Sequence, residues 1–419
     1  MQVTFVGFNA QKKEIPNVEL GETIELDFTL EEGGLQLEEI SVTAQADPVF
    51  NANRTGAGTN ISQQDIETTP TISRSLQDFT RLNPQVTSGN SFGGANSRYN
   101  NILIDGATLN DVFGLGEAIP GSQAGVTSPI SIDAIQEFNV DIAPFDVTNN
   151  GFTGGQVNAI TKSGTNEFTG SAYYQLRNES FIGNYQFEQG GETRVSNDYP
   201  SFDETYLGLN VGGPIIEDKL FFFVSGEFKR ESSPLTTGIQ GSGGANIFPY
   251  GEGTFTQIQN IAESVYGYNP GGYGLISQAQ DNDKLLAKID WNIDEDHKFT
   301  FRYNRVDAVD EEGIDRFTNS YSFGNRQYNF NSVQNSFVAE LNSSFGNDMS
   351  NTFRAVYTRI RDSRDVVAEP FPEVNLRVDD DRSIFMGIDR FSQANRLDQD
   401  LIEITNNFTY IRGDHEFTL

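Results

Sequence analysis

The sequence is poor in the residues on which many catalytic and metal sites depend. Its 419 residues include no cysteine, one tryptophan and two histidines, His297 and His415. The missing cysteines exclude disulfides and thiolate metal sites. Each histidine stands in an Asp-His turn of the kind expected at a strand junction, so a histidine-dependent catalytic triad is not predicted.

Long apolar runs are also missing, although 36% of the residues are hydrophobic. A membrane helix needs about 20 consecutive apolar residues, and the longest runs here, such as 220–224, have the length of a strand. The N-terminus lacks a basic segment followed by an apolar core, so no signal peptide is predicted. Because Met1 leads directly into strand-like sequence, we expect it to lie inside a longer protein.

Basic residues are outnumbered, since 28 Lys and Arg stand against 59 Asp and Glu and give a formal net charge of -31. Such an acidic chain argues against nucleic acid and against anionic lipid head groups as partners. The charge fits either a soluble acidic surface or solvated loops outside the cell.

Catalytic fingerprints are missing as well. Residues 89–93 match G-x-S-x-G, but no buried strand precedes them, as a hydrolase would require. Neither a Walker nor a Rossmann fingerprint occurs. Residues 307–312 and 379–381 are acidic enough to bind Ca²⁺ loosely, yet neither matches an EF-hand loop, and solvated loop charge is favoured. We therefore predict a protein that is not an enzyme and holds no cofactor or metal.

The sequence is rich instead in phenylalanine and tyrosine, with 33 and 15 residues. From about residue 167 onward, apolar and aromatic residues alternate with polar ones, as strands with one apolar face require. Amides, hydroxyls and charges of both signs fill the other face. The clearest alternations include Leu285, Ile289, Trp291, Phe301, Phe337, Phe353, Tyr357, Ile402 and Ile404 on the apolar face.

The connections between these strands alternate in length. Short turns fall near 214–219, 294–298, 346–349 and 412–416, and long polar segments occupy about 231–282, 308–331 and 361–399. Transmembrane β-barrels show this asymmetry, with short periplasmic turns and long outer loops. The pattern predicts a mostly β chain containing a truncated transmembrane antiparallel β-barrel. A secreted β-sandwich, which does not require the asymmetry, is the alternative.

The region 47–163 has a mixed α/β character and many Gly, Asn and Thr residues. A helix is predicted over 73–82, where Asn83-Pro84 stops it. Strands are predicted over 101–105 and 157–161, and a short helix over 131–138. We expect small sheets, short helices and long loops here.

Two motifs in this region resemble the plug of TonB-dependent outer-membrane transporters. The first is N-N-I-L-I-D-G at 100–106 followed by Asn110-Asp111, and the second runs from 154 to 166. The turn at 212–215, before a phenylalanine-rich strand, also resembles the family. Within the family, the chain resembles the Oar-like group of Bacteroidota-type bacteria. The motif residues are Asn101, Ile104, Asp105, Gly106, Asn110, Asp111, Gly154, Gly155, Asn158, Thr161, Lys162, Ser163 and Gly164.

The resemblance implies four parts of the chain. Residues 1–36 would be the C-terminal part of a carboxypeptidase-regulatory-like β-sandwich, 37–46 a TonB-box-like segment, 47–163 the plug and 164–419 the N-terminal part of the barrel. A complete barrel of this family has about 22 strands, whereas the alternation predicts about nine here. We therefore expect a sequence truncated at both ends.

The resemblance also implies a function. It is TonB-dependent active transport of an unidentified ligand across the outer membrane, with the plug and the N-terminal domain on the periplasmic side. The implied partners are TonB, outer-membrane lipid and an extracellular ligand. TonB would pair by strand addition with Glu38, Glu39, Ile40, Ser41, Val42, Thr43 and Ala44.

Ligand contacts would come from the plug-apex loops near 91–98 and 111–123. Arg98 and Tyr99 are candidates because they precede the first plug strand, although a structural role is favoured for both. The alternative function is a surface-exposed adhesion or structural β-protein, or a component of protein export, without nutrient uptake.

Overall fold

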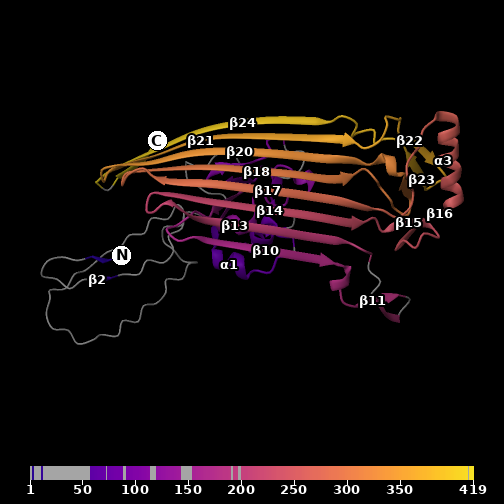
Figure 1. Cartoon of the computed structure of the whole chain (residues 1–419), viewed down its shortest axis with the longest axis horizontal. Coiled ribbons are helices and arrows are strands. Elements are labelled where there is room, and N and C mark those ends of the chain that lie inside the picture. Colours follow the sequence, from indigo (N-terminus) through magenta and orange to yellow (C-terminus); the bar gives the residue numbers. More distant parts are fainter. Residues whose placement is uncertain are drawn as a thin grey trace.

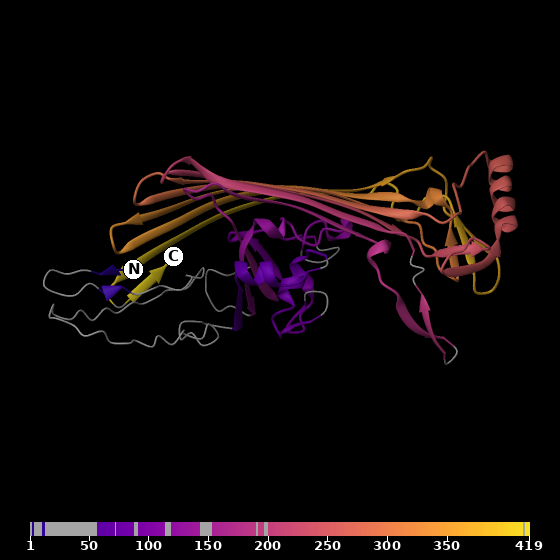
Figure 2. The ribbon, with the colours of Figure 1, turned by 60° about the horizontal axis from the view of Figure 1, so that its bottom comes forward.

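The computed structural model describes residues 2–3, 11–12, 57–71, 73–87, 91–113, 119–142, 153–189, 192–196, 200–413 and 415–419. Within them lie a large curved sheet, a small α/β domain on its concave side and a unit built from the long loops (Figures 1 and 2). The TonB-box-like segment expected at 37–46 lies outside the described residues. Of the sandwich expected at 1–36, the antiparallel pair β1 (Gln2–Val3) and β2 (Gln11–Lys12) is described.

No helix among the described residues combines the length and the apolar character needed to cross a membrane.

Nine strands form the large sheet, in the order β10-β13-β14-β17-β18-β20-β21-β24-β25. Each pairs antiparallel with its neighbours (Figure 1). The number of strands agrees with the sequence prediction. Their bounds are β10 Thr169–Asn178, β13 Asp203–Ile216, β14 Leu220–Pro234, β17 Ser277–Asn292, β18 His297–Glu312, β20 Tyr328–Phe345, β21 Met349–Val366, β24 Arg396–Arg412 and β25 His415–Thr418.

The two faces of this sheet differ as the alternation predicts, with the apolar face outside. Leu285, Trp291 and Phe353 are exposed, whereas the intervening Lys288 and the neighbouring Arg302 are buried. A water-soluble sheet buries its apolar face, and a membrane barrel turns that face toward lipid. The exposed apolar face therefore favours the barrel over the secreted sandwich.

The connections alternate strictly between the two ends of the sheet. At the short-turn end, residues 217–219, 293–296, 346–348 and 413–414 join consecutive strands. At the long-loop end, the connections are 179–202, 235–276, 313–327 and 367–395. The connection 179–202 contains the hairpin of β11 (Tyr185–Gln189) and β12 (Glu192–Ser196). The predicted asymmetry is confirmed.

The other three long connections fold together into one unit, here called the loop domain (residues 235–276, 313–327 and 367–395). It contains helix α3 (Glu252–Tyr266), and the rings of Phe248, Phe255, Tyr321 and Phe323 form its buried centre. The sequence pattern predicts polar segments in these connections and does not indicate this core. The strands are β15 (Thr237–Gln240), β16 (Asn246–Gly251), β19 (Ser320–Ser322), β22 (Val374–Arg377) and β23 (Ser383–Met386).

A second unit, the inner domain (described residues of 57–161), lies on the concave side of the large sheet (Figure 2). Its five-stranded sheet has the order β3-β8-β9-β6-β7, and β6 and β9 are parallel. The strands are β3 (Ala57–Ile61), β6 (Asn101–Ile104), β7 (Ala107–Thr108), β8 (Ile135–Ile142) and β9 (Gly155–Thr161). Smaller elements are α1 (Gln63–Thr68), β4 (Val86–Thr87), β5 (Ser91–Phe92), η1 (Ser97–Tyr99) and η2 (Ser122–Ala124).

Two helix predictions in the inner domain need correction. The helix expected over 73–82 is α2 (Leu76–Thr80), because Arg74 has a φ of 47° and Ser75 caps the first turn. The helix expected over 131–138 is a single 3₁₀ turn, η3 (Ile132–Ala134), and Ile135 already begins strand β8. Its alternating residues bury Phe138 and Val140 on one face, which suits a strand.

Candidate functional site

The plug-motif residues form the centre of the inner-domain sheet. Asn101, on β6, donates to Gln156, on β9, at 3.2 Å. Asn110 donates to the Asn101 side chain at 2.9 Å and accepts from the Ile102 amide at 2.8 Å. These amide side chains thus satisfy buried polar groups across β6 and β9. Ile104, between them and the Asp-Gly turn, is 1% exposed and belongs to the core.

Asp105 and Gly106 form the turn between β6 and β7, and both have a positive φ. Such turns take Asp-Gly readily because both residues must enter the left-handed region. Asp105 accepts from the amide and the hydroxyl of Thr161, each at 2.8 Å. Gly106 donates to Asn158 at 3.0 Å. The two motifs therefore meet at this turn.

The motif glycines allow close packing. An added Cβ at Gly154 would lie 3.0 Å from the Tyr99 carbonyl, and one at Gly155 would overlap the Phe92 ring. At Gly164 it would lie 2.7 Å from the Gly213 carbonyl of β13. Lys162 and Ser163 connect β9 to this point and are half-buried.

Polar contacts join the inner domain to the large sheet along most of its width. Seven strands, from β13 to β24, each contribute at least one hydrogen bond to an inner-domain residue. Three of these bonds end on a backbone carbonyl of the inner domain, and two join side chains of opposite charge. The pairs are Ser73 with Tyr206, Arg74 with Glu227, Thr161 with Lys288, Asp105 with Arg302, Pro120 with Gln334, Gly106 with Arg354 and Asp111 with Gln399.

Arg74 and Glu227 are at the centre of the first charged contact. Glu227 is 1% exposed, accepts from Lys284 at 2.8 Å and from the Tyr173 hydroxyl at 2.5 Å, and meets Arg74 at 3.3 Å. Arg74 also pairs with Asp133 of the inner domain and lies 4.3 Å over the Tyr173 ring. Buried charges need such partners because their desolvation is costly.

Asp105 is at the centre of the second charged contact. Arg302 donates to its carboxylate at 2.6 Å, and Lys288 donates to the Thr161 hydroxyl at 3.0 Å. Burial raises the pKa of the Asp105 carboxyl, but the charges of Lys288 and Arg302 and the bonds from Thr161 outweigh it. The net pKa is lowered, so Asp105 is a carboxylate at neutral pH.

A pocket of about 170 Å³ lies where the inner domain meets the long-loop end of the sheet. One side comes from Asp111, Phe113 and residues 121–123 of the inner domain, and the other comes from β20, β21, β24 and Asn395. Charges of both signs and apolar groups converge in it. The lining includes Asp111, Phe113, Gly121, Ser122, Gln123, Phe330, Asp362, Ser363, Arg364, Asn395, Arg396 and Leu397.

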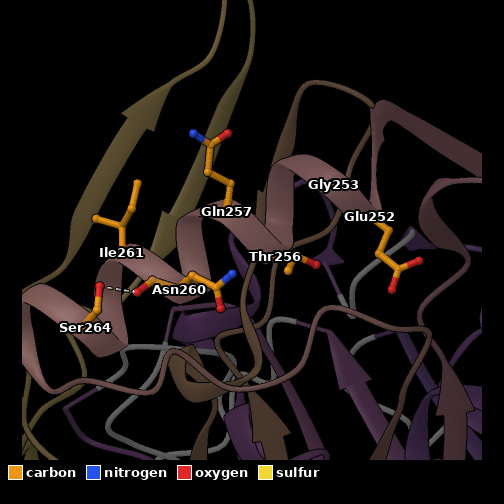
Figure 3. A pocket seen from close by; sticks show the side chains of 7 residues that line it. All are labelled: Glu252, Gly253, Thr256, Gln257, Asn260, Ile261 and Ser264. Carbon is orange, nitrogen blue, oxygen red and sulfur yellow. Dashed lines mark hydrogen bonds between the residues drawn. The ribbon is translucent and has the colours of Figure 1, made fainter.

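A second hollow, of about 620 Å³, lies on helix α3 of the loop domain. Figure 3 shows that the side chains lining it belong to one helix, and the Ser264 hydroxyl donates to the Asn260 carbonyl at 2.6 Å. Ligand sites usually converge from several elements. The pocket beside Asp111 and Gly121 is therefore the better candidate for a binding site.

Some candidates from the sequence lie elsewhere. Arg98 and Tyr99 are exposed on the turn η1 and do not line either pocket. The Tyr99 carbonyl accepts from the Gly154 amide at 2.9 Å, which is a structural role. Residues 38–44 lie outside the described residues.

The charged residues that face the inner domain were not predicted from the sequence as a group. Alternation did place Lys288 and Arg302 on the polar face of their strands. It could not pair them with Asp105, because the contact joins residues 197 positions apart. Apart from their charge, nothing in the sequence at Arg74 and Glu227 indicates that they contact each other.

Comparisons with known proteins agree with this architecture. A family model described as an outer membrane beta-barrel domain matches residues 160–243. The TonB-dependent transporter Oar of Myxococcus xanthus is 25% identical over 282 residues, which cover 64% of this chain and 25% of that protein. The chain therefore spans about a quarter of the length of the curated relative it matches.

Solved outer-membrane receptors share the fold. The outer membrane transporter YddB from Escherichia coli has a TM-score of 0.58 at 13% identity, over 84% of this chain and 45% of that one. The ferric enterobactin receptor PfeA from Pseudomonas aeruginosa has a TM-score of 0.53 at 17% identity, over 84% and 46%. The chain is thus similar in sequence to a TonB-dependent transporter and shares the fold of solved outer-membrane receptors, and these likenesses support a location in the outer membrane.

Proposed function

We propose that this chain takes part in TonB-dependent transport of a ligand across the outer membrane, with the inner domain as the plug of the barrel. The observation that carries the proposal is the set of hydrogen bonds and ion pairs that join the inner domain to seven strands of the large sheet, here called the wall, beside a smaller set of apolar contacts. Interfaces rich in polar contacts are typical of domains that move relative to each other. A plug has to seal the lumen at rest and move during transport.

The pocket beside Asp111 and Gly121 supports a binding role at the long-loop end. Its volume of about 170 Å³ is below the roughly 300–1,000 Å³ of sites that enclose a whole small ligand. It would therefore hold one part of a larger ligand. Arg364 and Arg396 would contact acidic groups, and Phe113 and Phe330 would contact apolar ones.

The TonB contact is proposed for 37–44. Strand addition depends on main-chain hydrogen bonds, and proline removes a backbone donor. In the full-length protein, Ile40→Pro should abolish crosslinking to the periplasmic domain of TonB, whereas Ile40→Val should retain it. If the proline variant crosslinks as well as the parent, this segment is not the TonB contact.

The alternative is adhesion or protein export without nutrient uptake. Adhesion would use the outer surface of the loop domain and would not require a movable inner domain. Conversely, export would use the same plug in the opposite direction. Cells carrying Ile40→Pro separate transport in either direction from adhesion, because loss of TonB pairing should stop energised transport and leave adhesion unchanged.

A further inference from the structure

Two cations face each other on the concave side of the sheet. Lys288 of β17 and Arg302 of β18 are directly opposite in the strand register. Both side chains point toward the inner domain and are buried, at 7% and 2% exposure. Like charges directly opposite on neighbouring strands destabilise a sheet, and burial makes the repulsion stronger. This pair therefore needs an anion.

Neighbouring carboxylates of the wall already have partners. One oxygen of Asp290 accepts from Thr300 at 2.9 Å and lies 3.6 Å from Lys298, and its other oxygen is buried and contacts no hydrogen-bond donor among the described residues, Lys288 and Arg302 included. Glu340 pairs with Arg354 at 2.7 Å. The carboxylate that Arg302 does contact belongs to the inner domain and is Asp105, at 2.6 Å.

The groups around the Asp105 carboxylate have the chemistry of an oxyanion site. The Thr161 amide, the Thr161 hydroxyl and an Arg302 nitrogen all donate to it. The Arg302 Nε is buried and has no hydrogen-bond partner among the described residues. Arg302 therefore has a hydrogen-bond donor, its Nε, that Asp105 does not use.

We propose that Lys288 and Arg302 form a carboxylate-binding site of the barrel wall. Asp105 fills it while the inner domain is seated, and a carboxylate group of the transported ligand fills it when the Asp105 turn moves away. The inference rests on the proposed function, because it assigns a step to the passage through the lumen. It names the ligand class as one that carries a carboxylate.

The site can be tested in the full-length protein by chemical rescue. Asp105 has a φ of 49°, which glycine adopts without strain, so Asp105→Gly removes the carboxylate and leaves its space open. The variant should have a lower thermal midpoint than the parent. Added sodium formate should restore most of that loss in a saturable manner, whereas neutral formamide should not.

Three controls define the outcome. Asp105→Asn fills the same space with a neutral amide and should not respond to formate. The double variant Asp105→Gly/Arg302→Gln should lose the rescue, and sodium chloride at equal ionic strength should not replace formate. An equal formate effect in all variants, or none in Asp105→Gly, would overturn the proposal.

The result is separable from the proposed function. Rescue by formate reports on the wall site alone and needs neither TonB nor an identified ligand. Rescue together with failed TonB crosslinking would keep the site and remove the transport role. Absence of rescue in a protein that crosslinks normally would remove only the carboxylate site.

Discussion

Arg74 and Glu227 meet at the boundary between the inner domain and the wall, and each has a second partner on its own side. Arg74 pairs with Asp133 of the inner domain, and Glu227 pairs with Lys284 of the neighbouring strand. If the two parts separate, neither charge is left alone. Separation therefore avoids the large cost of an unpaired buried charge.

The Glu227→Gln substitution should be strongly destabilising. It leaves buried Lys284 without its anion, and breaking a buried pair costs about 3–5 kcal/mol. Ser131→Ala, which removes one bond to the same carboxylate, should cost only about 1 kcal/mol. Denaturant unfolding of the full-length protein in detergent measures both, and equal midpoints for the two variants would contradict the account.

The Asp105 carboxylate should stabilise the protein in a pH-dependent manner. Its folded-state pKa is lowered, so its contribution is fully present above the unfolded-state value of about 3.9 and is lost as pH falls through the folded-state value. The difference in unfolding free energy between the parent and Asp105→Asn should stay constant from about pH 8 to pH 5 and shrink below about pH 4. A difference that grows on acidification would show that the folded-state pKa of Asp105 is raised, and it would contradict this prediction.

The Gly164→Ala substitution should disturb the connection between the inner domain and the large sheet. Its Cβ would press on the backbone carbonyls of β13 and β14, which cannot rotate away. We expect a loss of about 2 kcal/mol or more, as for overpacked sites. Gly253→Ala on exposed α3, where an added Cβ meets nothing within 4 Å, is the control and should be neutral or stabilising. Unfolding midpoints of the two variants provide the comparison.

At the level of elements, the barrel strands were predictable and the loop domain was not. Alternation in segments such as 285–291 needs no tertiary knowledge, because every second residue faces lipid. Strands of three to six residues such as β16 and β19 carry too little pattern, and they form because distant aromatic residues pack around them. Asp105 and Thr161 were found by resemblance, whereas their wall partners depend on a register that sequence does not specify.

The loop domain should unfold separately from the strands. Phe255 is fully buried among the rings of Phe248, Tyr321 and Phe323, and truncating a buried Phe costs about 3–5 kcal/mol. In Phe255→Ala, amides of the loop domain should lose protection from hydrogen exchange while β17 and β18 keep theirs. Ile261→Ala, on the exposed face of α3, should leave both unchanged. Loss of protection in the strands as well would show that the two units are coupled.

At the scale of the whole molecule, the two faces of the wall have different surroundings. The concave face contacts the inner domain, and the convex face is exposed to lipid. The convex face carries the apolar residues, so membrane insertion holds the wall in place. The concave face carries buried charges and amides that pair with the inner domain, and apolar residues such as Leu286 and Val306 that share a hydrophobic core with it. The proposed function therefore takes the inner domain as the part that moves.

The most direct test is the ionic conductance of the full-length receptor in a planar bilayer, measured during a urea titration. The account predicts no current in buffer, because the inner domain closes the lumen. It also predicts a reversible stepwise current at moderate urea, where the inner domain unfolds before the strands. A steady current without urea, or no current after the inner-domain amides have fully exchanged, would contradict a movable plug.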